Sequence, residues 1–260
     1  MLFELININS FPVFLLILVR VLGFFVTMPL LSYRTIPIQF RIGLSFFLAF
    51  MMFYTIDSSG FVLNELFFFL IFKEALVGIL VGLIGYIIIS AVQVAGGFID
   101  FQMGFAIANV MDPQTGAQSP ITGQYFYIIA LLFLLSVDGH HLLIDGIVNS
   151  YTFIPIDTFI PFHDGNIAEF VIRAFNSMFL IAFQISIPIV GCLFLVDVAL
   201  GIVSRTVPQL NVFVVGLPLK ILVSFAAILV FLSLYIVLAR TLFTTMFETM
   251  QGLMSLFGGA

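Results

Sequence analysis

The stretch ALVGILVGLIGYIIISAVQVA, residues 75–95, decides the fold, because it carries no charged side chain along its whole length. A helix that crosses a bilayer needs about 20 predominantly apolar residues, and this run is long enough. The other apolar runs lie at residues 11–31, 42–56, 61–72, 124–137, 168–203 and 219–239, and the run at 61–72 leads into 75–95. The pattern predicts an all-α, polytopic membrane protein with about six hydrophobic helical segments.

The composition points to the same class. Of the 260 residues, 62% are hydrophobic and 8% are charged, whereas a soluble domain is about 45–50% apolar and about 25% charged. The net charge of −5, with basic residues scattered singly, argues against nucleic-acid binding, which needs clustered Lys and Arg. The single cysteine, Cys192, excludes an intramolecular disulfide, and its apolar neighbours predict a buried, inert thiol.

The chain reads as one domain, residues 1–260, because no repeat and no disordered linker is visible. Residues 1–10 contain Glu4 and no Lys or Arg, unlike the basic start of a signal peptide, so we expect the first apolar segment to be retained. Residues 240–260 form a predicted helical tail. Its apolar face carries Phe243, Phe247, Met250 and Met254 at three- and four-residue spacing.

Several features favour a chain that packs against other chains along much of its length. Gly78, Gly82 and Gly85 leave one helix face without bulk, so another helix can approach closely. Pro188 with Gly191, and the sequence GLP at 216–218, predict breaks in the helices, because proline removes a helix hydrogen bond. An ordinary bundle with kinked helices explains the same residues equally well.

Charged residues inside the apolar segments are candidates for function, because each costs about 2.5–3.5 kcal/mol at the centre of a membrane helix. They are Arg20, Lys73, Glu74, Arg173 and Asp197. Lys73 and Glu74 are adjacent, so on a helix they point about 100° apart and need not pair with each other. We expect partner subunits to supply the counter-charges, or the helix ends to reach water.

No constellation for covalent chemistry is visible, so the sequence predicts a protein that is not an enzyme and has no cofactor, no catalytic residue and no metal. His141 and Asp145 share a helix face, and His140 is adjacent, but a third ligand and the HExxH pattern are missing. Solvated loop histidines are the better interpretation. The interpretation as a membrane-embedded enzyme has no support, because the sequence shows no nucleophile elbow, no phosphate loop and no paired carboxylates.

The stretch 96–123 is the most polar internal segment, with glycines at its start and Asp-Pro and Ser-Pro breakers further on. Between membrane segments, irregular backbone persists only inside protein or beside a water-filled cavity. The stretch is therefore a candidate gate that enters a channel. A plain surface loop is the alternative.

Short motifs along nearly the whole chain resemble those of the flagellar biosynthetic protein FliR family, whose injectisome relatives form the T component of the same type III export gate. The most specific are SRTVPQLNVF at 204–213 and GLPLK at 216–220. The others are RVLG at 20–23, MP at 28–29, RTIP at 34–37, RIG at 41–43, QMG at 102–104, DP at 112–113 and DGHH at 138–141. Many family members have Asn in place of Asp138, so this chain carries an additional negative charge there.

The resemblance implies a structural and gating component of the flagellar type III export gate in the bacterial inner membrane, at the flagellar basal body. Unfolded flagellar subunits would pass through this gate. One such chain would join several FliP- and FliQ-like subunits in a helical ring of broken helical hairpins, beside FlhA- and FlhB-like export proteins. Its N-terminal half would resemble FliP and its C-terminal half FliQ.

The resemblance also assigns residues. The family's channel plug, carried to this chain, is the loop from Ala106 to Thr122, and its named members are Ala106, Ile107, Asn109, Val110, Met111, Asp112, Pro113, Gln114, Ser119, Pro120 and Thr122. The residues expected to carry the family motif and assembly contacts are Arg20, Arg205, Pro208, Gln209, Asn211, Phe213, Pro218 and Lys220. The alternative function is a stand-alone secondary transporter, a class in which broken helices meet at a midplane site.

Overall fold

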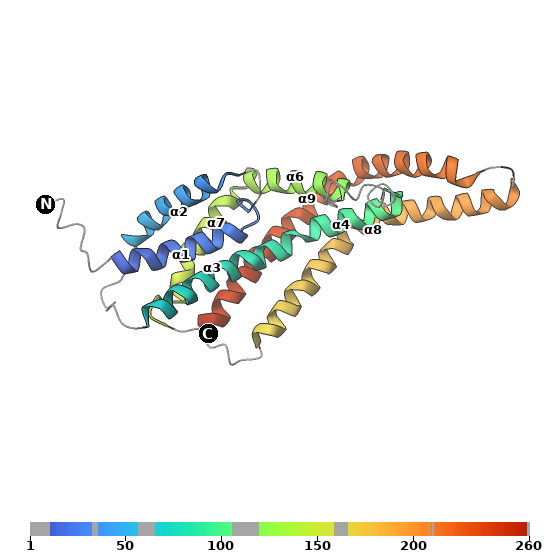
Figure 1. Ribbon diagram of the computed structural model, residues 1–260. Helices are drawn as coiled ribbons and strands as arrows, with labels where there is room; N and C mark the ends of the chain where they lie inside the picture. Colours follow the sequence, from blue (N-terminus) through green and yellow to red (C-terminus); the bar gives the residue numbers. More distant parts are fainter. Residues whose placement is uncertain are drawn as a thin grey trace. The chain divides into compact units, whose positions relative to one another are not determined.

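The computed structural model describes residues 11–32, 36–56, 66–105, 120–158, 166–207, 209 and 211–258, without the side chains of Asn166, Val212 and Phe213. All regular secondary structure in these ranges is helical (Figure 1). The helices are α1 (Phe11–Thr27), α2 (Ile38–Phe53), α3 (Phe67–Ile89), α4 (Ala91–Met103), α6 (Ile121–Ser136), α7 (Gly139–Phe153), α8 (Asn166–Thr206) and α9 (Val212–Gly258). The predicted all-α class is confirmed.

Three helical stretches among the described residues are long and apolar enough to cross a membrane: Phe67–Met103, Ile167–Thr206 and Val214–Gly258. The broken pair of α6 and α7 makes a fourth if it counts as one span, and α1 and α2 are shorter apolar helices. The prediction of a polytopic membrane protein is therefore confirmed. The uneven segment lengths are also real, from 13 residues in α4 to 47 in α9.

One compact unit comprises Met1–Ile88, Asp138–Phe175 and Thr244–Ala260. In this unit α2 lies beside α1 (Figure 1). The buried residues of α2 are Ser45, Ala49 and Met52, whereas its large aromatic side chains Phe46, Phe47 and Phe50 are exposed. Because α2 buries mainly small residues, it presents an apolar, aromatic face at the surface of this chain.

The end of α9 belongs to the same unit and has the apolar face that its spacing predicts. Met250 and Met254 are buried, and Phe247 is half-buried. Gly252 lies close to the ring of Phe170 on α8, since an added Cβ at Gly252 would lie 3.1 Å from that ring. The predicted helical tail is thus the end of α9 and packs inside the unit.

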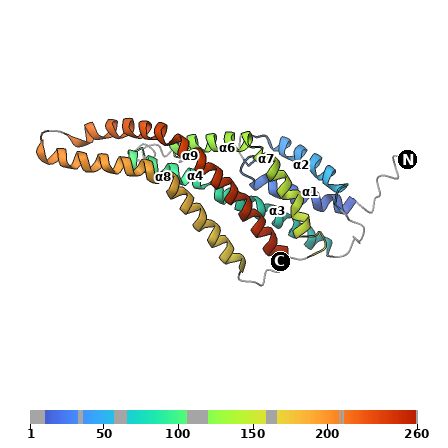
Figure 2. The same cartoon turned by 180° about the vertical axis from the view of Figure 1, so that it is seen from behind.

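A second compact unit comprises Ile89–Val137 and Asn176–Phe243. In this unit α4 packs against α6. Gly96 allows the approach, because an added Cβ there would collide with the backbone of Gly123. The parts of α8 and α9 in this unit lie side by side as a hairpin, which Figures 1 and 2 show from opposite sides.

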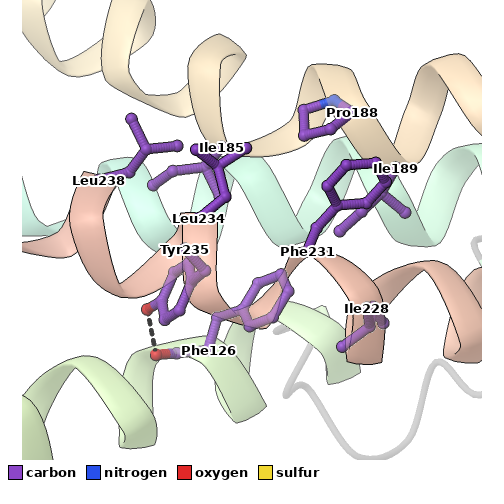
Figure 3. Close-up of a pocket in the computed structure, with 9 residues that line it drawn as sticks. All are labelled: Phe126, Ile185, Pro188, Ile189, Ile228, Phe231, Leu234, Tyr235 and Leu238. Atoms are coloured by element: carbon purple, nitrogen blue, oxygen red, sulfur yellow. Dashed lines mark hydrogen bonds between the residues drawn. The ribbon is translucent and has the colours of Figure 1, made fainter.

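The core of the second unit forms where α6, α8 and α9 meet. The Tyr235 ring on α9 stacks on Phe126 of α6 at 4.6 Å, and its hydroxyl donates to the Phe126 carbonyl oxygen at 2.6 Å. A cavity of about 10 Å³ lies beside this contact. Figure 3 shows its lining residues, among them Pro188 on α8 and Phe231 on α9. A space of this size holds about one water molecule, so the three helices are closely packed here.

The prolines inside the apolar segments do not break the helices, and this part of the sequence interpretation was wrong. Helix α8 continues through Pro188, and α9 continues through Pro218. A proline removes one hydrogen bond and crowds the carbonyl of the residue four positions earlier. Neighbouring turns and packed helices compensate for one such loss in an apolar helix. The break at Pro188 and Gly191, on which the transporter alternative depended, is therefore absent.

The sequence analysis did not predict a helix directly after the apolar run 124–137. Residues 139–153 form α7, so His140 and His141 lie in a helical first turn rather than in the predicted loop. Polar side chains separate its apolar residues in the sequence, so the pattern did not indicate the apolar face on which Leu143 and Ile147 are fully buried. Helix α4 likewise extends to Met103, well into the predicted polar stretch 96–123.

Candidate functional site

The glycines of α3 lie where this helix crosses α1 in the first unit. An added Cβ at Gly78 would collide with the Arg20 carbonyl oxygen, and one at Gly82 would collide with the Thr27 hydroxyl oxygen. Thr27 in turn donates to the carbonyl oxygen of Ile79 at 3.1 Å. A Cβ added at Gly85 would lie 3.2 Å from the sulfur of Met250. The close neighbours of this glycine face are therefore α1 and α9 of the same chain.

The same crossing holds a buried charge cluster around Arg20. Its guanidinium donates to Glu74 from Nε at 2.5 Å and from Nη2 at 3.0 Å. It also donates to the Ser150 hydroxyl at 3.0 Å and to the Ile154 carbonyl oxygen at 2.9 Å. The guanidinium carbon lies 3.6 Å from the centre of the Tyr151 ring. Arg20 and Glu74 are both completely buried, so this pair joins α1, α3 and the end of α7.

Lys73 completes the cluster. Its Nζ lies 2.7 Å from Glu74 Oε1 and donates to the carbonyl oxygens of Pro155 and Ile156, each at 2.9 Å. The expectation that Lys73 and Glu74 need not pair was wrong, because the Lys73 ammonium reaches Glu74 Oε1. The expected external counter-charges are also not needed here. Glu74 and backbone carbonyls of the same unit compensate both cations.

The last turns of α4 carry the polar contacts of the second unit. The buried carboxylate of Asp100 accepts hydrogen bonds from the Thr122 hydroxyl and, at 3.2 Å from Oδ2, from the Thr122 backbone amide. Thr122 lies in the first turn of α6, and the amides there have no partner within the helix. Asp100 therefore caps α6 from the neighbouring helix. Sequence reasoning missed Asp100, although a lone carboxylate in the otherwise uncharged run 75–103 was a visible signal.

A second cluster joins α4, α8 and α9 around Asp197. Gln102 Nε2 donates to Asp197 Oδ2 at 2.8 Å, and Lys220 forms an ion pair with Asp197 Oδ1. Two residues further on, Gly104 ends α4 in the left-handed conformation with φ 91°, and an added Cβ there would lie 2.7 Å from Leu217. The counter-charge of Asp197 again comes from this chain, not from a partner.

The structure also places some of the remaining sequence-assigned residues. Of the expected plug, residues 106–119 lie outside the described residues, Pro120 directly precedes α6, and Thr122 is buried in its first turn. Of the motif residues, Pro208 and the Phe213 side chain lie outside the described part. The exposed residues Arg205, Gln209 and Asn211 lie at the end of the α8–α9 hairpin, and Pro218 is exposed within α9.

Two further candidates are surface features. Arg173 pairs with Glu169 at 2.6 Å, one turn away on α8, and both side chains are exposed. Asp138 adopts the left-handed conformation with φ 56° before α7, and its carboxylate and the ring nitrogens of His140 and His141 lie within 4.8 Å of one another. Exposed groups of this kind are common without a metal, so the absence of a metal site stays a prediction.

These features define an all-α, polytopic membrane protein in which Arg20, Lys73, Glu74 and Asp197 are paired with charges of the same chain. Residues 11–246 match the family described as bacterial export proteins, family 1. The chain therefore belongs to this family of bacterial export proteins.

Relatives of known name support the membership. The chain is 56% identical to the flagellar biosynthetic protein FliR of Bacillus subtilis over 96% of its own length and 98% of the relative. It is 28% identical to the protein of the same name in Escherichia coli, over 92% and 91% of the two chains. It is also 28% identical to the Yop proteins translocation protein T of Yersinia pestis, over 79% and 80%.

Proposed function

We propose that this chain is a structural and gating component of the flagellar type III protein export gate in the bacterial inner membrane. The observation that carries the proposal is the 56% identity to a flagellar biosynthetic protein over nearly the full length of both chains. The relative named as a translocation protein adds support for a role in moving proteins across a membrane. Unfolded flagellar subunits are then the transported substrates, and the chain itself carries out no covalent chemistry.

The exposed apolar surface supports a role inside a larger assembly. In the most apolar 18-residue stretch of α8, only 33% is buried within the chain, and in that of α9 only 22%. The rest must be covered by lipid or by other apolar proteins, because water does not solvate it. FliP- and FliQ-like subunits in a ring are the partners that we propose, together with FlhA- and FlhB-like export proteins. In that ring the N-terminal half of the chain would take a FliP-like place and the C-terminal half a FliQ-like place.

The gating role is assigned to the segment between α4 and α6. Its two ends are fastened together, because Asp100 binds Thr122 and Gly96 lies against the backbone of Gly123. Apolar residues of the segment would fill a constriction, and a constriction that excludes water also resists ions. A fixed base would let the segment move aside for a substrate chain without loosening the helices that support it.

Deleting residues 109–118 should leave the complex assembled but make the inner membrane permeable to small ions, because the apolar constriction would lose its filling. The measurement is ion conductance, or the decay of membrane potential, in cells that lack the native chain and produce the deletion variant. The full-length chain in the same cells should restore secretion of flagellar subunits.

The control for leakage is a variant with the exposed pair altered, Glu169→Gln with Arg173→Gln, produced at the same level. This variant should conduct no more than the unaltered chain. A deletion variant that assembles normally and shows unchanged conductance would argue against the plug assignment.

A further inference from the structure

Three residues in the last turns of α4 each contact a different helix of the second unit. Asp100 binds Thr122 on α6, Gln102 binds Asp197 on α8, and Gly104 lies against Leu217 on α9. Asp100 and Gln102 are two positions apart, so on a helix they point to different sides. Gly104 directly follows the helix and leaves it in the left-handed conformation, with φ 91°. The end of α4 is therefore the place where α6 and the α8–α9 hairpin are tied to one element.

Asp197 is the centre of the hairpin side of this junction. It accepts a charge-assisted hydrogen bond from Gln102 and pairs with Lys220, so α4 and α9 both bind the same carboxylate on α8. Its neighbours on the helix, Phe194 and Leu195, are exposed apolar residues. A carboxylate among such residues is costly in a membrane helix unless it is paired. Both contacts therefore hold the Asp197 side chain in place.

We infer that Gln102 and Asp197 are positioning residues that hold the α8–α9 hairpin in a fixed orientation against α4 and α6. The hairpin carries exposed apolar side chains, among them Ile202 on α8 and Leu222 on α9, which are the surfaces that neighbouring subunits would cover. The contact at Asp197 therefore sets the angle at which this chain presents those surfaces. The inference deepens the proposed function. The position of the hairpin can be measured without it, whereas the expected effect on secretion rests on the proposed function.

The test is the distribution of distances between spin labels on the hairpin and on α6, in the full chain purified from membranes with its bound partners. Ile202→Cys on α8 and Tyr125→Cys on α6 are exposed labelling sites. Cys192 is the single native cysteine and is replaced by Ala. Gln102→Leu then removes one donor without changing the charge. We expect the ratio of docked to undocked hairpin to fall by about tenfold or more, which broadens the distribution.

A charge-swapped variant tests the ion pair separately. Asp197→Leu should broaden the distribution, because Lys220 loses its partner. Asp197→Lys with Lys220→Asp restores a pair, and the Gln102 amide can rotate to offer its oxygen as an acceptor. The distance distribution of the swapped variant should therefore be narrower than that of Asp197→Leu. The matched control is Glu169→Gln with Arg173→Gln, an exposed pair on the same helix that should leave the distribution unchanged.

Distributions of unaltered width in both Gln102→Leu and Asp197→Leu would overturn the inference. Secretion of flagellar subunits provides the second measurement, and we expect it to fall in Gln102→Leu at unchanged amounts of chain in the membrane. A broadened distribution with normal secretion would overturn the link between hairpin position and export. Normal secretion in cells without the chain would instead contradict the proposed function itself, so the two failures are distinguishable.

Discussion

Replacing Glu74 by Leu is expected to destabilise the first unit by about 3–5 kcal/mol, because an uncompensated buried charge remains when one partner of a buried pair is removed. Two cations lose their carboxylate at once, since Arg20 and Lys73 both bind Glu74. The loss should appear as a lower midpoint of thermal unfolding and a much smaller amount of chain recovered from membranes in mild detergent.

The comparison variants separate loss of charge balance from loss of packing. Arg20→Leu with Glu74→Leu removes one cation together with the carboxylate, and Lys73 keeps two carbonyl partners. This double variant should lose less stability than Glu74→Leu alone. Glu169→Gln removes a carboxylate from an exposed pair, which contributes about 0–1 kcal/mol. A Glu74→Leu chain as stable as the Glu169→Gln chain would show that the cluster does not hold the unit together.

Replacing Gly78 by Ala is expected to destabilise the crossing of α1 and α3 by about 1–3 kcal/mol, which is typical of overpacking. The added methyl group would meet the Arg20 carbonyl oxygen, a backbone atom that cannot move without shifting α1. That shift would also disturb the contact between Arg20 and Glu74. Gly82→Leu should have a larger effect still and block assembly, because it must displace Thr27 as well as add bulk.

Gly43→Ala is the matched control, because Gly43 is an exposed residue of α2 with no atom within 4 Å of an added Cβ. In an exposed helix interior this change stabilises by roughly 0.5–1 kcal/mol. The two substitutions add the same methyl group and should therefore have opposite signs in thermal unfolding. Equal midpoints for Gly78→Ala and Gly43→Ala would refute the close crossing.

The apolar runs predicted the long helices well, because a membrane helix needs only length and low charge. The errors arose where local signals and packing disagree. Pro188 and Pro218 are breakers by local rules, yet each helix continues because one missing hydrogen bond is small against the packing of a long apolar helix. The helix α7 was missed because its apolar residues are separated by polar side chains, and burial of Leu143 and Ile147 is a tertiary effect.

The buried charges show a second difference between sequence and structure. Arg20, Glu74 and Asp197 are visible as charges in or beside apolar runs, and in the structure each of them forms an ion pair within the chain. Lys73 is adjacent to its partner Glu74, but other partners lie far along the chain, such as Ser150 for Arg20 and Gln102 for Asp197. Spacing along one helix cannot indicate such contacts. The signal therefore indicates that a charge is special, and the fold decides whether its partner lies in the same chain.

The most direct test of the export-gate account is affinity purification of this chain from its native membranes in mild detergent, with the co-purifying proteins identified and counted by mass spectrometry. The account predicts one copy of the chain together with several copies of FliP- and FliQ-like subunits. Recovery of the chain alone, or as a simple homodimer, would contradict it.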